Sequence, residues 1–165
     1  MRLKIRHNAE IAHRLTRTQG KCQQIHGHGL QIALTFLWLK YDGETAMAVN
    51  NSGETFEFGE MKRTFRAYID DQYDHRLLLN KADPFAGPIY RVTAGNSLTT
   101  DSEQVFLPGL NLMEDDPTVE NLARWIAKWA CARFKADVVC SIEETKTNGA
   151  EVCTRWDGFR AVEQP

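Results

Sequence analysis

A thiol and two imidazoles lie close together in the stretch KCQQIHGHGL, residues 21–30. Cys22 is separated by three residues from the triplet His26-Gly27-His28. On a strand, residues at i and i+2 point to the same face, so both imidazoles would face one side. Such a group is compatible with part of a zinc site, with a thiol nucleophile and its base, or with polar packing.

Two strands are predicted to position these imidazoles. Residues 30–38 alternate in hydropathy, and His26 and His28 fall on the inward parity of that strand. The N-terminal segment alternates as well, and its inward set is Leu3, Ile5, Ala9, Ile11 and His13. His13 can therefore meet the other two imidazoles, and three imidazoles with an open fourth position are what a catalytic zinc ion requires. The alternative is a pair of hydrogen-bonded histidines at a strand end.

The rest of the chain predicts two helices and two further strands. Apolar residues recur at helical spacing from Phe58 to Ile69, and again after Thr118, which is a plausible N-cap. Strand patterns follow at residues 137–145 and near residues 150–156, whereas residues 81–116 are rich in Gly and Pro and are expected to be a loop excursion, with or without a short hairpin. The order predicts a single α+β domain over residues 1–165 with an antiparallel sheet.

Three further groups can take part in chemistry. Asp74 and His75 are adjacent at the end of the first predicted helix, and a carboxylate beside an imidazole can tune it for proton transfer. Glu144 lies on an apolar parity of its strand, so it needs a partner. Cys22 is either a fourth metal ligand or a free thiolate beside the metal, and spacing does not decide between the two.

Composition argues against several classes of protein. The 165 residues carry a formal net charge of -2, which gives no excess of cations for a nucleic-acid partner. No apolar run reaches the roughly 18 residues that span a bilayer. We therefore expect no nucleic-acid and no membrane partner, and a cytoplasmic protein. The four cysteines lack C-x-x-C spacing and are expected to be free thiols.

An ordered set of motifs resembles the 6-pyruvoyltetrahydropterin synthase and 6-carboxytetrahydropterin synthase family over nearly the whole chain. The motifs are AHRL, C-x-x-x-HGH, FGEMK, YDHRLLLN, DPTVENLA and IEET. The resemblance implies a zinc-dependent pterin enzyme of the tunnelling fold, with two helices on one face of a four-stranded antiparallel sheet. It further implies assembly into trimers or hexamers and the substrate 7,8-dihydroneopterin triphosphate.

The resemblance also implies a role for each site residue. The zinc ligands fall on His13, His26 and His28, and the nucleophile-like cysteine falls on Cys22. The catalytic Asp-His pair falls on Asp74 and His75. The glutamate that binds the pterin ring falls on Glu144, and Thr118 matches a threonine near the pterin pocket.

The short gap between Cys22 and His26 resembles the bacterial 6-carboxytetrahydropterin synthases of 7-deazaguanine (queuosine precursor) synthesis. The implied reaction is a carbon-carbon lyase reaction that releases acetaldehyde and triphosphate and needs no nicotinamide or flavin. Two alternatives stay open: a pyruvoyl-forming enzyme with the same site, and a non-catalytic zinc-stabilised binding module in which Cys22 closes the metal site.

Overall fold

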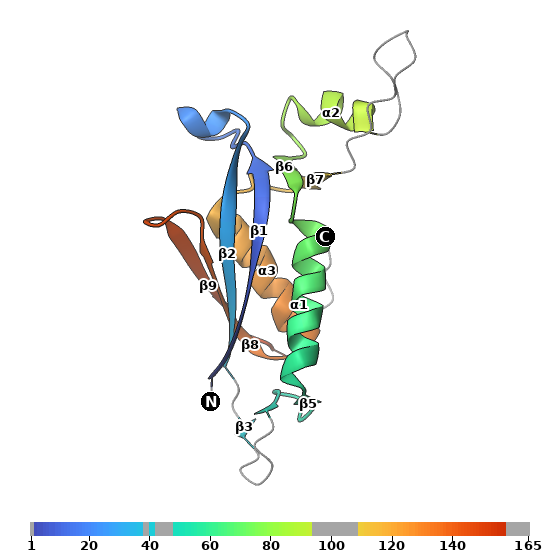
Figure 1. Cartoon of the computed structure of the whole chain (residues 1–165), viewed down its shortest axis with the longest axis vertical. Helices are drawn as coiled ribbons and strands as arrows, with labels where there is room; N and C mark the ends of the chain where they lie inside the picture. Colours follow the sequence, from blue (N-terminus) through green and yellow to red (C-terminus); the bar gives the residue numbers. More distant parts are fainter. Residues whose placement is uncertain (1, 38–39, 42–47, 94–108, 158–165) are drawn as a thin grey trace.

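A long antiparallel hairpin forms the centre of the molecule, and the computed structural model describes residues 2–37, 40–41, 48–93 and 109–157. Strand β1 (Arg2–His13) pairs with β2 (His26–Leu37) along its whole length (Figure 1). Both strands were predicted from hydropathy alternation, although Trp38 of the second pattern lies outside the described residues. The register runs from Arg2 opposite Leu37 to His13 opposite His26.

Four more strands extend this hairpin into a six-stranded sheet. On one side β8 (Asp137–Glu143) pairs antiparallel with β2, and β9 (Gly149–Thr154) pairs antiparallel with β8. On the other side β6 (Arg76–Asn80) runs parallel to β1, and β7 (Leu110–Met113) runs parallel to β6. The strand order is β7-β6-β1-β2-β8-β9.

The expected four-stranded antiparallel sheet is therefore wrong in its detail, because the sheet is mixed and has six strands. The two strands of this sheet that were not predicted, β6 and β7, are short. Strand β6 begins soon after helix α1 ends, so its apolar residues look like the end of the helical pattern. A separate small sheet joins β3 (Lys40–Tyr41), β4 (Ala48–Val49) and β5 (Thr55–Phe56).

Helices α1 (Phe58–Gln72) and α3 (Val119–Phe134) pack on one face of the sheet, as expected (Figure 1). Their buried side chains join the inward residues of β1, β2 and β8 in one hydrophobic core. The two helices also touch each other through Tyr68 and Trp129, whose rings stack with centroids 3.7 Å apart.

The segment 81–116 is not a loop throughout. It contains a third helix, α2 (Ala86–Thr93), and strand β7, while residues 94–108 lie outside the described part of the chain. Strand β7 of this segment pairs in parallel with β6. In the described part of the chain, none of the helices combines the length and the apolar character that crossing a membrane requires.

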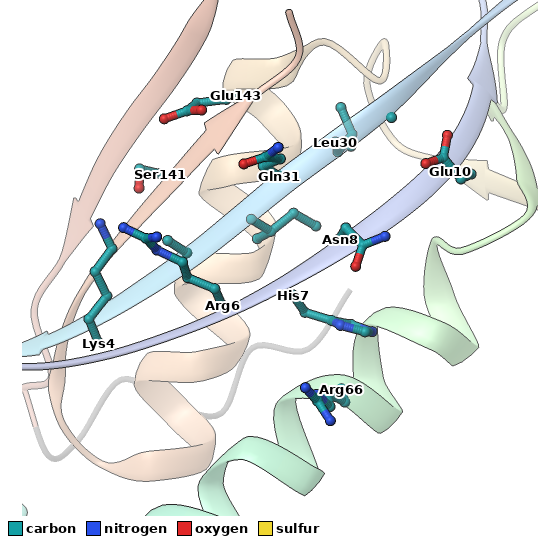
Figure 2. A pocket seen from close by; sticks show the side chains of 13 residues that line it. Lys4, Arg6, His7, Asn8, Glu10, Leu30, Gln31, Arg66, Ser141 and Glu143 are labelled. Carbon is teal, nitrogen blue, oxygen red and sulfur yellow. The ribbon is translucent and has the colours of Figure 1, made fainter. Parts of the chain in front are cut away.

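The face of the sheet opposite the helices is polar and open. Figure 2 shows Lys4 and Arg6 of β1, Gln31 of β2 and Glu143 of β8 around a hollow whose lining also includes Arg66 of α1. The residues that line the hollow do not include the three histidines of the predicted metal site. The sheet thus separates a polar face from the face that carries the core and the inward histidines.

Candidate functional site

The hairpin register brings three imidazoles together at one end of the sheet. His13 lies opposite His26, and Ile11 lies opposite His28, so all three histidines are on the inward face. One nitrogen from each ring lies within 4.8 Å of one from each of the others. The Nε2 atoms of His13 and His26 are 3.2 Å apart. A β-carbon on Gly27 would lie 2.9 Å from the Ile11 carbonyl oxygen, so the triplet needs glycine between its histidines.

Backbone carbonyls orient two of these rings. His13 Nδ1 donates a hydrogen bond to the Pro117 carbonyl at 2.8 Å, and His26 Nδ1 donates to the Gln24 carbonyl at 2.8 Å. With the proton on Nδ1, each Nε2 keeps its lone pair for a metal, an arrangement typical of metal-binding histidines. Burial lowers the pKa of His13, which is 1% exposed, and this favours the neutral ring that a metal requires. The donor set therefore fits a divalent metal such as Zn²⁺.

Glu144 points into the same site. Its Oε1 lies 3.7 Å from His13 Nε2 and 3.6 Å from His28 Nε2. The residue directly follows β8, and its backbone N–H donates to the Asn148 carbonyl across the turn to β9. The predicted inward carboxylate thus meets imidazoles on this chain.

Cys22 lies in the connection between the two histidine strands. It is exposed in the 3-10 turn Lys21–Gln23, and its carbonyl accepts a hydrogen bond from the Leu15 N–H at 2.9 Å. Within the described residues its thiol makes no hydrogen bond to the histidines, and it is a free cysteine. The turn ends at Gln24, whose carbonyl orients His26, so the thiol and the His26 ring belong to one short segment.

Asp74 and His75 form a pair immediately before β6. Asp74 Oδ2 lies 2.7 Å from His75 Nδ1, and Asp74 Oδ1 accepts from the Glu10 N–H at 2.8 Å. Burial alone would raise the pKa of Asp74, but the hydrogen bonds from Glu10 and His75 hold it below its ordinary value. Glu10 precedes His13 by three positions on β1, so the pair lies about 10 Å along the strand from the His13 ring.

The His75 imidazole is presented to solvent. Its side chain is 79% exposed, whereas that of Asp74 is 28% exposed. His75 also has φ +55°, a backbone conformation that is uncommon outside glycine and is often found at functional sites. The His75 N–H donates to the Glu10 carbonyl at 2.7 Å, which holds this conformation in place.

Thr118 caps helix α3. Its hydroxyl accepts a hydrogen bond from the Asn121 N–H at 3.3 Å, which agrees with the interpretation of Thr118 as an N-cap. The neighbouring Pro117 provides the carbonyl that orients His13. The start of α3 is therefore tied directly to the histidine cluster.

Asp116 was not among the site residues predicted from the sequence. Its buried carboxylate accepts hydrogen bonds from the Thr16 hydroxyl, the Arg17 N–H and the Asn80 side chain, and thus joins the segment after β1 to the end of β6. The sequence carries no signal for this role, because the burial of Asp116 and its hydrogen-bond donors are known only from the structure.

Comparison with known proteins agrees with this architecture. A solved structure of an uncharacterised protein from Wolinella succinogenes superposes with a TM-score of 0.71 at 16% identity, covering 94% of this chain and 98% of that one. The 6-pyruvoyltetrahydropterin synthase of Plasmodium vivax superposes with a TM-score of 0.60 at 12% identity, with the same coverage of 94% and 98%. At these identities the likeness concerns the fold.

Comparison with related sequences identifies the family. Proteins from Rickettsia conorii and Rickettsia felis named 6-carboxy-5,6,7,8-tetrahydropterin synthase are each 28% identical over 117 residues, which is 69% of this chain and 68% of each relative. The family model described as 6-pyruvoyl tetrahydropterin synthase matches residues 2–154. This chain therefore belongs to the 6-pyruvoyl tetrahydropterin synthase family.

Proposed function

We propose that this protein converts 7,8-dihydroneopterin triphosphate and water into 6-carboxy-5,6,7,8-tetrahydropterin, acetaldehyde and triphosphate, with Zn²⁺ as cofactor. The observation that supports this best is the convergence of His13, His26 and His28, with two Nδ1 atoms held by carbonyls and the Nε2 atoms turned toward one another. Three imidazoles without a fourth cysteine ligand are typical of a catalytic zinc site with an exchangeable position.

Zn²⁺ bound to the three imidazoles would polarise the side-chain hydroxyls of the substrate and lower their pKa. Cys22, as thiolate, removes the proton from the first side-chain carbon. Its exposed position on a turn next to Gln24 supports this role, because substrate can reach the thiol without displacing a metal ligand.

Asp74 and His75 complete the proton transfers. His75 donates and accepts protons through Nε2, because Nδ1 is engaged by Asp74. Asp74 stays ionised through its hydrogen bonds to Glu10 and His75, so it stabilises the protonated ring. Cleavage between the first two side-chain carbons then yields acetaldehyde, and the redox change stays within the substrate.

Glu144 anchors the pterin. A carboxylate on the inward face can accept hydrogen bonds from the ring N–H and the exocyclic amine together, a charge-assisted pair with defined geometry. Thr118 lies beside Pro117 at the same end of the sheet and is placed near the ring in this proposal.

The carboxy product is favoured over the pyruvoyl product for two reasons. The gap between Cys22 and His26 is short, and the curated relatives from Rickettsia carry the name 6-carboxy-5,6,7,8-tetrahydropterin synthase. A physiological role in 7-deazaguanine synthesis belongs to this proposal.

A product assay tests the reaction. Purified protein is incubated with 7,8-dihydroneopterin triphosphate, acetaldehyde is followed with a coupled dehydrogenase, and the pterin is identified by chromatography. We expect equal amounts of acetaldehyde and carboxylated pterin, and a Cys22→Ala variant that keeps its zinc but loses turnover. A pyruvoyl product without acetaldehyde would assign the other reaction of the family, and zinc loss in Cys22→Ala would favour the closed binding module.

We further propose that the chain forms a homo-oligomer, a trimer or a hexamer. The two outer strands of the sheet, β7 and β9, each have one edge without a strand partner in the described residues, and such edges favour pairing with another copy. Light scattering after size-exclusion chromatography measures the mass directly, and a monomer at micromolar concentration would contradict the proposal.

A further inference from the structure

The carboxylate of Glu144 lies against the metal-facing nitrogens with no other partner. Its Oε1 is 3.7 Å from His13 Nε2 and 3.6 Å from His28 Nε2, and its side chain is 18% exposed. Among the described residues the two imidazoles are the only groups that its oxygens approach as polar partners. A side chain whose role is limited to holding a pterin ring has no need for these contacts.

The distances from Glu144 to His13 and His28 are close to those between two ligands of one metal ion, although Glu144 is outside the group of His13, His26 and His28, whose ligand atoms all lie within 4.8 Å of one another. Donor atoms bound about 2.0–2.2 Å from a tetrahedral zinc ion stand roughly 3.3–3.6 Å apart. The separation of His13 Nε2 and His26 Nε2, 3.2 Å, is close to this range. The separations from Glu144 Oε1 to His13 and His28 are close to it as well. A carboxylate oxygen is also an accepted zinc ligand.

We propose that Glu144 is a fourth metal ligand while no pterin is bound, and that its carboxylate leaves the metal to receive the pterin ring. The inference rests on the proposed function, in which Glu144 anchors the ring. The metal would thus be four-coordinate at rest and would gain its open position only when substrate arrives. The carboxylate also balances part of the charge of the ion at a site where His13 is fully buried.

The position of Glu144 in the fold allows this exchange. The residue lies one position beyond β8, and its backbone is held by the Asn148 carbonyl at 3.0 Å. Its side chain has three rotatable bonds and no hydrogen bond to the scaffold within the described residues. The carboxylate can therefore turn between two positions without moving the strand.

Linkage gives this exchange a measurable sign. If metal and pterin compete for one carboxylate, each must weaken the binding of the other by the same factor. A pterin that lacks side-chain hydroxyls cannot compensate by binding the metal. Such a pterin should therefore bind the metal-loaded protein more weakly than the metal-free protein.

The test uses the full chain loaded with Co²⁺, whose visible absorption reports the number and type of ligands. We expect Glu144→Gln to change the spectrum and to weaken Co²⁺ binding on the order of 10-fold or more. Glu143→Gln is the matched control, because Glu143 is exposed on the opposite face, and its spectrum and affinity should equal those of wild type. Circular dichroism of each variant verifies the fold.

A second measurement follows the wild-type protein. Wild-type Co²⁺ protein is titrated with 6-methylpterin, and we expect the spectrum to shift toward that of Glu144→Gln. An unchanged spectrum and unchanged Co²⁺ affinity in Glu144→Gln would overturn the inference. If that variant also lost pterin binding, the ring-anchoring role in the proposed function would stand while the metal-ligand role would fall.

Discussion

The histidine cluster and the Asp74–His75 pair use imidazole in opposite ways. In the cluster, His13 is fully buried, and His13 and His26 each give one nitrogen to a backbone carbonyl. In the pair, His75 is exposed and gives one nitrogen to a carboxylate. The two sites are only about three residues apart along β1.

This difference shows how the surroundings select the chemistry of a ring. A carbonyl keeps the proton on Nδ1 and leaves Nε2 free for a metal, and burial lowers the pKa of His13 although its hydrogen bond to the Pro117 carbonyl acts in the opposite direction, which suits a metal ligand. A carboxylate stabilises the protonated ring, and solvent exposure lets protons exchange, which suits an acid or a base. Substitutions that affect one site alone should therefore separate metal binding from catalysis.

The largest expected effect comes from removing a cluster ring. His26→Ala should lower zinc affinity by more than about 100-fold, since even residues that only orient a ligand commonly contribute 10–100-fold. Competition with a chelator of known affinity measures this change. His7→Ala is the control, because His7 lies on β1, the strand that pairs with the strand of His26, but bonds to Asp70 of α1 at 2.6 Å. Equal zinc affinity in wild type and His26→Ala would remove His26 from the metal site.

The second effect concerns the pair. Asp74→Asn should lower kcat by about 10²–10⁴, the usual contribution of a positioned acid or base, while zinc content stays unchanged. Steady-state kinetics and metal analysis on the same sample check both parts. The chain offers a matched control in Asp70→Asn, four residues earlier, whose partner is His7. If both variants lost activity equally, the pair before β6 would have no special role.

The third effect tests the support behind the cluster. Asp116→Asn places an amide among the donors of Thr16, Arg17 and Asn80, and we expect a loss of about 2–3 kcal/mol in the free energy of unfolding. Urea denaturation measures it. Asp115→Asn is the control: its partly exposed pair with Arg124 should contribute less than about 1 kcal/mol. Equal losses of unfolding free energy in Asp116→Asn and Asp115→Asn would show that the hydrogen bonds of Asp116 do not support the histidine cluster.

The stabilisation by Asp116 should depend on pH. Burial alone would raise the pKa of Asp116, but the donated hydrogen bonds lower it below its ordinary value. As the solution is acidified, the Asp116 carboxylate is protonated in the unfolded chain before it is protonated in the folded protein. The free energy of unfolding therefore decreases as the pH is lowered. The difference between wild type and Asp116→Asn should be complete above about pH 5 and shrink below about pH 4.

The smallest effect separates two roles of Thr118. Thr118→Ala removes the acceptor for the Asn121 N–H and should lower the free energy of unfolding by about 1 kcal/mol, whereas Thr118→Ser should restore it. Calorimetry with a pterin tests the binding role. Weaker pterin binding in Thr118→Ser, with stability restored, would show that the threonine methyl group contacts the ring.

Hydropathy periods in the sequence were sufficient to predict strands β1, β2, β8 and β9 and helices α1 and α3. The same alternation placed His13, His26 and His28 on one face, because parity on a strand is a local property. Glu144 was expected inward for the same reason, although its partners were not foreseen.

Pairing between distant segments could not be predicted from the sequence. β6 has five residues and β7 has four, and their parallel pairing depends on contacts far away in the chain. The carbonyls of Gln24 and Pro117 were also missed, since every residue has a carbonyl and its direction depends on the fold. The role of Asp116 was missed because its hydrogen-bond donors Asn80 and Thr16 lie 36 and 100 positions away in the sequence.

The backbone of Glu10 holds the Asp74–His75 pair from both sides, because its N–H donates to Asp74 and its carbonyl accepts from His75. Neither contact involves the Glu10 side chain, which is exposed on the other face of the sheet. Position 10 should therefore tolerate almost any residue that forms a strand without disturbing the pair. Proline is the exception, because it has no N–H to donate. In an evolving lineage the geometry of this pair can thus persist while the residue that maintains it changes freely.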